Sequence, residues 1–344
     1  MFNNKTIIIT GGTGSFGRAC TKRILDKYIP KSLRIFSRDE LKQWEMSNQL
    51  SSHPRFKKLR FFLGDVRDKE RVMRAFEDCD YVIHAAALKQ IPAAEYNPTE
   101  CIKTNILGAQ NVIDGALNMG VKRLVALSTD KAAAPVNLYG ASKLCAEKLF
   151  IAANNMTGKR DIRFSVVRYG NVMGSRGSVV PLFLSLKNSK TVPITHPDMS
   201  RFNFLLNEAV DLVLHVFRKQ WGGEIYIPKI PSFKITDLAK AIAPKAKVKY
   251  IGIRSGEKLF EEMITASDSY NTVDLGKYYV ILPSSKDIGW SNDEFIKKTK
   301  AKKVVEGFSY NSRDNTKWLS VPQLRKLISQ NFDDTKKTQA SPDY

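Results

Sequence analysis

A glycine-rich turn between an apolar strand and a helix constrains the fold of this chain more than any other feature. Residues Lys5–Thr10 read as a buried strand and Phe16–Tyr28 as a helix, with Gly11, Gly14 and Gly17 at their junction. The spacing G-x-x-G-x-x-G is longer by one residue at its first step than the usual dinucleotide fingerprint. Glycines allow a tight turn and let the backbone approach a pyrophosphate at the helix N-terminus. The sequence therefore predicts a dinucleotide site, whose contacts in this turn are Gly11, Thr13, Gly14, Ser15, Phe16 and Gly17.

Strand and helix patterns alternate from residue 5 to about residue 170. This alternation predicts an α/β fold with a doubly wound parallel sheet. The further strands are expected at Leu33–Phe36, Arg60–Leu63, Tyr81–His84, Leu124–Leu127 and Phe164–Tyr169. The further helices are expected at Glu40–Leu50, Lys69–Glu77, Glu100–Met119 and from Tyr139 to about Asn154.

The later part of the chain predicts a smaller C-terminal lobe that binds substrate. We expect residues 1–170 to form the Rossmann domain, with about 203–228 packing back on it. Residues 171–202 and 229–332 would form the lobe, and the polar segment 333–344 a disordered tail. Within these parts we expect loops at 175–181 and 193–201, helices at 208–219 and 236–242, and strands at 224–227 and 247–253. Beyond residue 265 the periodicity weakens.

Composition limits the class of protein. The chain has 344 residues, 43% of them hydrophobic and 26% charged, which is typical of a soluble globular protein. It has no apolar run long enough to span a membrane and no signal-peptide pattern, so we expect a cytoplasmic protein that is not membrane-bound. Its four cysteines and four histidines are scattered, which predicts reduced thiols and no metal site.

The formal net charge of +21 invites a nucleic-acid interpretation. However, the basic residues are spread along the chain and interleaved with acids, and the densest cluster is Lys297–Lys303. We therefore expect no nucleic-acid partner. A positive field that attracts anionic nucleotides is the alternative use of this charge.

Residues after the second and third strands bear on the choice of dinucleotide. A Rossmann fold often has an acid here for the ribose 2′-hydroxyl, and the chain instead has Ser37-Arg38-Asp39. Ser37 and Arg38 would hold a 2′-phosphate, which favours NADP. In the other interpretation Arg38 is a solvated charge and Asp39 binds the ribose, as in an NAD enzyme. The remaining cofactor-binding candidates are Glu40, Leu41, Lys42, Asp65, Val66, Ala86 and Lys89.

A cluster of acid, base and phenol follows the fifth strand. Asp130 and Lys131 lie at its end after Thr129, and Tyr139 and Lys143 lie four residues apart on the next helix. Positions i and i+4 share a helix face, and a nearby ammonium favours a phenolate, so Tyr139 is a candidate general base. Asp130 and Lys131 could instead be a surface ion pair. Upstream, Asn105 is either a helix-surface amide or a brace for the catalytic loop.

The N-terminal glycine pattern with a later Tyr-x-x-x-Lys resembles extended short-chain dehydrogenases/reductases over residues 5 to about 265. Within that family, Asp130-Lys131 resembles the inverting UDP-N-acetylglucosamine 4,6-dehydratases that begin pseudaminic acid synthesis. The same resemblance extends over the runs Ser37–Lys42, Ala94–Pro98, Arg168–Val172, Gly174–Ser178 and Gly223–Lys229.

The resemblance implies a mechanism. Tyr139, aided by Thr129 and Lys143, would take the proton of the C4 hydroxyl while hydride passes to NADP⁺. Lys131 would remove the C5 proton and Asp130 would protonate the departing C6 hydroxyl. Hydride would return to C6, and protonation of C5 from the opposite face would give inversion. For this role the pKa of Lys131 must fall, which we expect from burial and from neighbouring positive charges.

The resemblance also implies a nucleotide-sugar site and self-association. The substrate-binding candidates are Lys89, Asn171, Val179, Arg201, Arg254 and Glu257. Each charged candidate could instead be a surface charge. We expect UDP-N-acetylglucosamine as substrate and a homo-oligomer, either a dimer or a hexamer. The alternatives are a UDP-sugar 4-epimerase and a non-catalytic dinucleotide-binding scaffold.

The chain departs from the family pattern at four positions. We would expect His at Gln90, Asn at Ala134, Trp at Asn203 and His at Phe260. Gln90 and Asn203 are expected near the sugar, so these two leave the identity of the sugar open.

Overall fold

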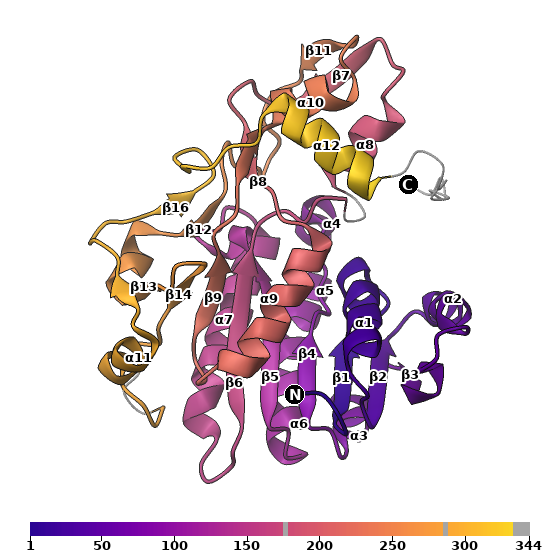
Figure 1. Ribbon diagram of the computed structural model, residues 1–344, viewed down its shortest axis with the longest axis vertical. Coiled ribbons are helices and arrows are strands. Elements are labelled where there is room, and N and C mark those ends of the chain that lie inside the picture. Colours follow the sequence, from indigo (N-terminus) through magenta and orange to yellow (C-terminus); the bar gives the residue numbers. More distant parts are fainter. Residues whose placement is uncertain (175–177, 285–287, 333–344) are drawn as a thin grey trace.

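The computed structural model describes residues 1–174, 178–284 and 288–332. The predicted tail 333–344 and part of the predicted loop 175–181 lie outside these residues. Within them, the molecule consists of a large α/β domain with a smaller lobe at one end, at the top of Figure 1.

A large sheet forms the centre of the first domain. Its strand order is β15-β13-β14-β9-β6-β5-β4-β1-β2-β3. The parallel strands are β1 (Thr6–Thr10), β2 (Ser32–Ser37), β3 (Leu59–Leu63), β4 (Tyr81–His84), β5 (Arg123–Thr129), β6 (Arg163–Tyr169) and β9 (Ile225–Pro228). The order reverses between β1 and β4, which is where doubly wound sheets bind their ligands. The predicted fold class is confirmed.

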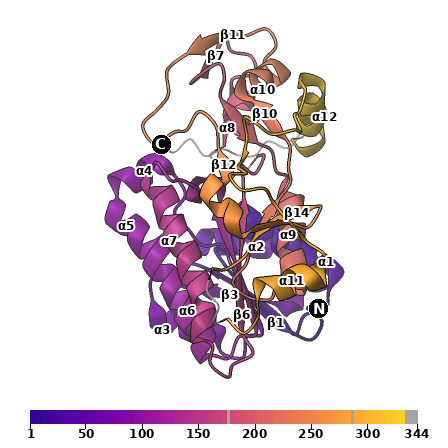
Figure 2. The same cartoon turned by 90° about the vertical axis from the view of Figure 1, so that its left-hand side faces the viewer.

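Helices cover both faces of this sheet. Figure 2 shows α3, α6 and α7 on one side and α1 and α9 on the other. The helices of this domain are α1 (Ser15–Lys27), α2 (Glu40–Leu50), α3 (Lys69–Phe76), α4 (Ile91–Tyr96), α5 (Pro98–Ile102), α6 (Gly108–Asn118), α7 (Leu138–Ala152), α9 (Leu206–Lys219) and α11 (Asn292–Thr299). None of the helices in the described ranges is long and apolar enough to cross a bilayer.

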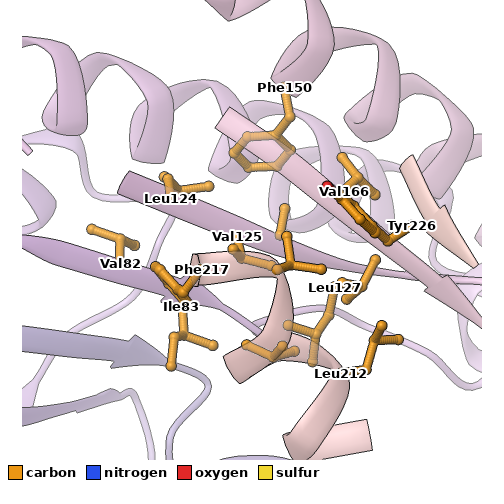
Figure 3. Packing of buried hydrophobic residues seen from close by; sticks show 14 of the residues in the cluster. Val82, Ile83, Leu124, Val125, Leu127, Phe150, Val166, Leu212, Phe217 and Tyr226 are labelled. Carbon is orange, nitrogen blue, oxygen red and sulfur yellow. The ribbon is translucent and has the colours of Figure 1, made fainter. Parts of the chain in front are cut away.

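The core lies between the sheet and these helices. Figure 3 shows Val125 of β5 between Phe150 of α7 on one side and Leu212 and Phe217 of α9 on the other. Val125 and Phe150 are almost completely buried. The strands are apolar on both faces because both faces are covered, so their sequences show continuous apolar runs without alternation.

The segment predicted as one helix over Glu100–Met119 is interrupted. It comprises α5, a π-helical turn over Lys103–Leu107, and α6. The wide turn contains Asn105, which is buried. A π-turn often marks a functional position in a helix.

The large sheet also takes strands from a segment that the sequence assigned to the smaller lobe. Strands β14 (Tyr278–Ile281), β13 (Thr272–Asp274) and β15 (Lys302–Lys303) continue the sheet antiparallel beyond β9. The segment 229–332 therefore divides between the two parts of the molecule. These strands are very short, so their sequences carry little periodic signal.

The smaller lobe has its own hydrophobic cluster. Helices α8 (Val179–Ser185), α10 (Ile235–Ile242) and α12 (Val321–Asn331) pack there through Phe183, Leu238 and Leu324. Three strand pairs complete the lobe and its junction: β7 (Thr191–Ile194) with β11 (Lys247–Tyr250), β8 (Ser200–Phe202) with β10 (Ser232–Lys234), and β12 (Glu262–Ile264) with β16 (Tyr310–Asn311). Helix α8 lies partly in a predicted loop. Its Pro181 is accommodated because it sits in the first turn, where an N–H has no helical partner.

Candidate functional site

A two-part cleft lies at the carboxyl ends of the parallel strands, below the smaller lobe. The larger part has a volume of about 1240 Å³ and runs along the glycine-rich turn. The smaller part has a volume of about 480 Å³ and extends into the lobe. Lys131, Asn171, Arg254 and Glu257 line both parts. A molecule with two long arms, or two molecules that meet at Lys131, would fit this shape.

The glycine-rich turn is built for close backbone approach. Gly11 has a φ of 64°, and a Cβ on it would lie 2.8 Å from the backbone of Ala86. Helix α1 begins at Ser15 after Gly14, so no side chain caps its first N–H groups. This arrangement fits a pyrophosphate, which would accept hydrogen bonds from those N–H groups.

The larger part of the cleft collects nearly all predicted cofactor-binding residues. Glu40 and Leu41 do not line it, and the Leu41 side chain is exposed on α2. Those that do are Gly11, Thr13, Gly14, Ser15, Phe16, Gly17, Ser37, Arg38, Asp39, Lys42, Asp65, Val66, Ala86, Lys89, Tyr139 and Lys143. The structure thus brings together residues from the ends of β1, β2, β3 and β4 with two residues of α7, as a dinucleotide site requires.

The end of β2 carries the groups that distinguish NADP from NAD. The Ser37 hydroxyl is buried and lies 2.8 Å from the Thr13 hydroxyl. Asp39 accepts a hydrogen bond of 2.9 Å from the Lys42 backbone N–H and forms an ion pair with the Lys42 ammonium. Arg38 is half exposed and lies 3.6 Å from Asp65. The Asp39 carboxylate therefore already serves as the N-cap of α2, while Arg38 faces the cleft.

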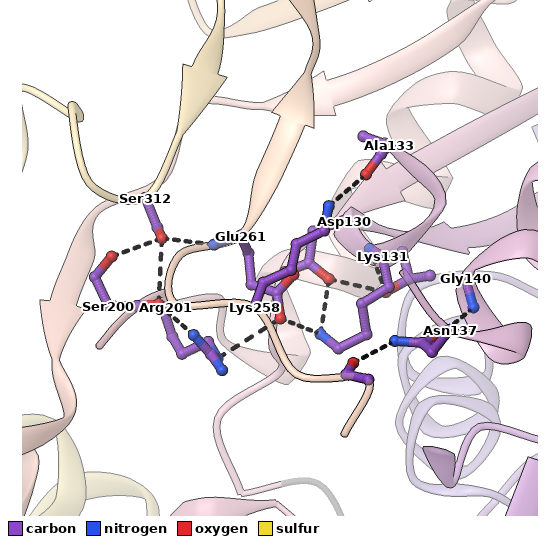
Figure 4. A network of polar contacts seen from close by, with 12 residues as sticks. Asp130, Lys131, Ala133, Asn137, Gly140, Ser200, Arg201, Lys258, Glu261 and Ser312 are labelled. Atoms are coloured by element: carbon purple, nitrogen blue, oxygen red, sulfur yellow. Dashed lines mark hydrogen bonds and ion pairs between the residues drawn. The ribbon is translucent and has the colours of Figure 1, made fainter. Parts of the chain in front are cut away.

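The end of β5 presents the acid and base cluster. The Lys131 ammonium lies 3.0 Å from Asp130 Oδ1 and 3.0 Å from Glu261 Oε1. Asp130 has 0% of its surface exposed, so the pair is not a surface ion pair. Arg201 contributes a further positive charge, with its Nε 3.6 Å from Glu261 Oε1. Figure 4 shows these groups around one point at the junction of the two domains.

The two carboxylates differ in how readily they ionise. Burial, together with the charge of Glu261, raises the pKa of Asp130 against the opposing effect of Lys131. Lys131 and Arg201 lower the pKa of Glu261 and outweigh its burial. Asp130 is thus the member of the pair that holds a proton more readily, as a general acid must.

The pKa of Lys131 does not fall as expected from the sequence. Burial lowers it, but the charges of Asp130 and Glu261 outweigh burial and raise it above its ordinary range. The prediction of a lowered pKa was wrong because the sequence did not reveal Glu261. The protein alone therefore holds Lys131 as an ammonium.

Tyr139 lies beside this cluster at the start of α7. A Cβ on the next residue, Gly140, would lie 2.2 Å from the Lys131 carbonyl oxygen, so glycine allows the helix to approach the loop. Burial raises the pKa of Tyr139 to about 12, against the charge of Lys131 and a hydrogen bond with Thr129. The positive charge that acts most on this phenol is thus Lys131, where the sequence had indicated Lys143.

Lys143 shows the opposite behaviour from Lys131. Burial lowers its pKa to about 8, with Glu147 and Cys101 opposing the shift. Glu147 itself pairs with Arg168 through bonds of 3.0 and 2.6 Å. At neutral pH Lys143 therefore carries its charge with only a small margin.

Asn105 is a brace, but it does not hold the loop after β5. Its side chain exchanges hydrogen bonds of 2.8 and 2.9 Å with the backbone of Leu88 and donates one of 2.9 Å to Ser142. It therefore fixes the loop after β4 against α7. Lys89 follows this loop, and burial lowers its pKa.

The smaller part of the cleft collects most substrate-binding candidates. Asn171, Val179, Arg201, Arg254 and Glu257 line it. Lys89 lines only the larger part. The Arg201 side chain is largely buried, whereas Arg254 is more than half exposed. Two guanidinium groups thus line the smaller part of the cleft, and Arg254 lines the larger part as well.

The four departures from the family pattern have different surroundings. Asn203 is buried and lines the smaller part, and its Oδ1 has no hydrogen-bond partner among the described residues. Gln90 is exposed and lines the larger part. Ala134 adopts a φ of 45°, a region in which asparagine is better tolerated than alanine. Phe260 stacks under Arg313, at 4.4 Å. Of the four, Asn203 is the one that lines the smaller part of the cleft.

Sequence reasoning missed Glu261, Lys258 and Asn137. Lys258 donates a hydrogen bond of 2.8 Å to the Ala133 carbonyl, and Asn137 donates one of 2.8 Å to the Gly256 carbonyl. Both bonds join the segment before β12 to the loop after β5. The sequence signal for Glu261 was a carboxylate inside the otherwise mostly apolar stretch 259–264.

Comparisons with known proteins agree with this geometry. The family model described as "Polysaccharide biosynthesis protein" matches residues 7–283. A Campylobacter jejuni protein named UDP-N-acetylglucosamine 4,6-dehydratase (inverting) is 55% identical, over 96% of this chain and 98% of its own length. A Rickettsia akari protein named UDP-glucose 4-epimerase is 43% identical, over 95% of this chain and 96% of its own. The crystal structure of Pen from Bacillus thuringiensis matches with a TM-score of 0.85 and 36% identity, covering 96% of this chain and 98% of that one.

Proposed function

We propose that this chain, which belongs to the polysaccharide biosynthesis protein family of extended short-chain dehydrogenases/reductases, dehydrates UDP-N-acetylglucosamine at C4, C5 and C6 and inverts C5. One observation carries the proposal: the buried Asp130–Lys131 pair lies at the junction of the two parts of the cleft, beside Tyr139. Elimination of water needs an acid and a base on one substrate, and this pair supplies both. The product would be a UDP-2-acetamido-2,6-dideoxy-L-arabino-hexos-4-ulose.

Tyr139 would begin the reaction by accepting the proton of the C4 hydroxyl, with Thr129 hydrogen-bonded to the same oxygen. A bound nicotinamide dinucleotide supplies the acceptor for the C4 hydride and later the hydride for C6. Because the protein's own groups hold the Tyr139 pKa at about 12, the phenol needs additional positive charge near it to act as a base. Lys143 would hold Tyr139 and the ribose of the dinucleotide in position.

Lys131 would then remove the C5 proton, which the C4 ketone acidifies, and Asp130 would protonate the departing C6 hydroxyl. Lys131 rests as an ammonium, so it must first lose its proton within the bound complex. Because Asp130 holds its own proton for the C6 hydroxyl, the Glu261 carboxylate, with Oε1 3.0 Å from Lys131 Nζ, is the group within reach to accept it. The raised pKa of Asp130 supports its role as proton donor.

The test is incubation of the purified protein with UDP-N-acetylglucosamine. We expect a product lighter by one water, and in D₂O we expect deuterium at C5 with the inverted configuration by NMR. Tyr139→Phe is the control and should give no product. The second candidate function, a 4-epimerase, is favoured by the name of the Rickettsia relatives. An isobaric UDP-N-acetylgalactosamine as sole product would support it and would exclude dehydration.

We propose NADP as the dinucleotide. Arg38 faces the cleft and Asp39 is engaged at the helix cap, which together suit a 2′-phosphate better than a 2′-hydroxyl. Arg38→Ala should weaken NADP binding by about tenfold and leave NAD binding within about twofold, since an exposed charge-assisted contact contributes about 1.5 kcal/mol. Binding titrations with both dinucleotides measure this. Equal losses for NADP and NAD would contradict the assignment.

We further propose that the enzyme works in the cytoplasm as a homo-oligomer, a dimer or a hexamer, and that its product enters pseudaminic acid-type surface glycans. The description of the matching family, polysaccharide biosynthesis, supports the use of the product in a glycan. Light scattering of the purified protein gives the subunit number, and a monomer at micromolar concentration would contradict the first part.

A further inference from the structure

Glu261 is a buried acid that lines the cleft. It is not among the residues predicted to bind the dinucleotide or the nucleotide-sugar. It lies just before β12, and only 2% of its surface is exposed. Its backbone is fixed on both sides by Ser312: its N–H donates 3.0 Å to the Ser312 hydroxyl, and the Ser312 N–H donates 2.8 Å to its carbonyl. Ser312 in turn bonds the Ser200 hydroxyl at 2.8 Å. These bonds fix the backbone of Glu261. Its carboxylate points toward Lys131 (Figure 4) and lines the smaller part of the cleft.

The segment that carries Glu261 is also joined to the catalytic loop. Lys258 reaches the Ala133 carbonyl and Asn137 reaches the Gly256 carbonyl, each at 2.8 Å. Glu261 comes from the later part of the chain and Asp130 from the end of β5. These two bonds keep the distance between them fixed.

Glu261 has more positive charge close to it than Asp130 has. Lys131 lies 3.0 Å from both carboxylates, and Arg201 lies near Glu261 alone. One oxygen of each acid, Asp130 Oδ2 and Glu261 Oε2, is buried with no hydrogen-bond partner among the described residues. A buried ammonium needs one carboxylate as its counter-charge, and a second carboxylate in the same place is easier to protonate.

We propose that Glu261 is a positioning residue for the elimination step: it serves as the counter-charge of the resting Lys131 ammonium and so leaves Asp130 free to carry the proton that the C6 hydroxyl receives. This inference rests on the proposed function. Arg201 selects which acid stays ionised, because it lies beside Glu261. Without Glu261, Asp130 would have to ionise to balance Lys131, and the proton donor would be lost.

The directions of the pKa shifts agree with this assignment. The charge of Glu261 raises the pKa of Asp130, and Lys131 and Arg201 lower that of Glu261. The charged or titratable groups that face the pair are Lys131, Arg201, Lys258 and Tyr139. Loss of the Glu261 charge should therefore move the Asp130 pKa down.

The experiment compares Glu261→Gln and Glu261→Asp with the wild type. Glu261→Gln should lower kcat by about 10²-fold or more, as expected for loss of a general acid, while the Kd of UDP changes less than about threefold. The fall of kcat with rising pH should begin at lower pH, because protonated Asp130 disappears earlier. Glu261→Asp keeps the charge and should retain the wild-type pH profile. Glu262→Gln, a change at the adjacent half-buried acid, is the matched control and should match wild-type kcat.

A second readout does not depend on turnover. Infrared difference spectra across the pH range should show a protonated carboxyl band that Asp130→Asn removes and that Glu261→Gln shifts to lower pH. A folded Glu261→Gln enzyme with wild-type kcat and pH profile would overturn the inference. If that variant does not fold, Glu261→Asp decides: a pH profile displaced from the wild type would overturn it. A wild type that dehydrates nothing, together with a carboxyl band that Glu261→Gln still shifts to lower pH, would count against the proposed function alone.

Discussion

Lys131 precedes Tyr139 in the sequence and Lys143 follows it. Both lysines are largely buried, and their pKa values move in opposite directions. The pKa of Lys131 is raised because Asp130 and Glu261 each lie 3.0 Å from its ammonium. The pKa of Lys143 is lowered to about 8 by burial, with the opposing charge of Glu147 too weak to prevent it. Both lysines are desolvated, so burial does not distinguish them. The difference comes from which carboxylates are available to each.

Glu147 is not available to Lys143 as a close partner because Arg168 engages both of its oxygens, at 3.0 and 2.6 Å. Arg168 also donates a hydrogen bond of 2.8 Å to the carbonyl of Met263, in β12. The same pair therefore holds α7, β6 and β12 together and leaves Lys143 weakly protonated. In the protein alone Lys131 keeps its charge, whereas Lys143 loses its charge as the pH rises through about 8.

Substitution of Lys131 tests the lysine whose pKa is raised, and it has the largest expected effect. Lys131→Ala should lower kcat for dehydration by about 10³-fold, in the range of lost acid–base catalysis, because both the C5 base and the partner of two acids disappear. The Kd of the dinucleotide should stay within about threefold. Product assays with a parallel binding titration measure both. Loss of dinucleotide binding would mean that Lys131 is structural.

Substitution of Glu147 tests the surroundings of Lys143, the lysine whose pKa is lowered. Glu147→Gln leaves the buried Arg168 with Asp268, at 3.3 Å and partly exposed, as its remaining counter-charge, so the free energy of unfolding should fall by about 3 kcal/mol. It should also lower the pKa of Lys143 further, since the charge of Glu147 opposes that shift. Denaturant unfolding measures the first effect.

The matched control for that measurement is Asp161→Asn. Asp161 pairs with Arg123 at 3.2 Å but is 74% exposed, so its loss should cost less than about 1 kcal/mol. Equal destabilisation by the two variants would contradict the view that the Glu147–Arg168 pair ties the elements together.

A pH titration of dinucleotide binding sharpens the comparison with the smallest expected effect. The pKa of Lys143 is about 8, so its ammonium is present below that pH and lost above it. If the ammonium holds the dinucleotide, the Kd should rise by up to about tenfold for each pH unit above the pKa of the free protein. Calorimetry in two buffers should detect uptake of a proton on binding. Lys143→Met should bind weakly and independently of pH, and a pH-independent wild type would contradict the assignment.

Some of this protein was determined by local sequence. The glycine-rich turn, the strand–helix alternation to β6 and the bounds of α2 and β4 follow from short-range pattern, because each depends on neighbouring residues and on burial of whole strands. The convergence of Ser37, Asp65 and Thr129 at one edge follows from topology, since parallel strands end on the same side. These features made the dinucleotide half of the cleft predictable.

Only the tertiary structure decided the charge of the acid–base cluster. Glu261 comes from a segment far from Asp130 in sequence, and its effect on the pKa of Lys131 depends on a separation of 3.0 Å. Strands β13 to β15 joined the large sheet because β14 pairs with β9, β13 with β14 and β15 with β13, which their short sequences do not specify. The sequence by itself predicted most of the groups that line the dinucleotide part of the cleft. The folded structure decided their protonation, because the electrostatic energy of a buried charge depends on distance and partners in space and not on residue type.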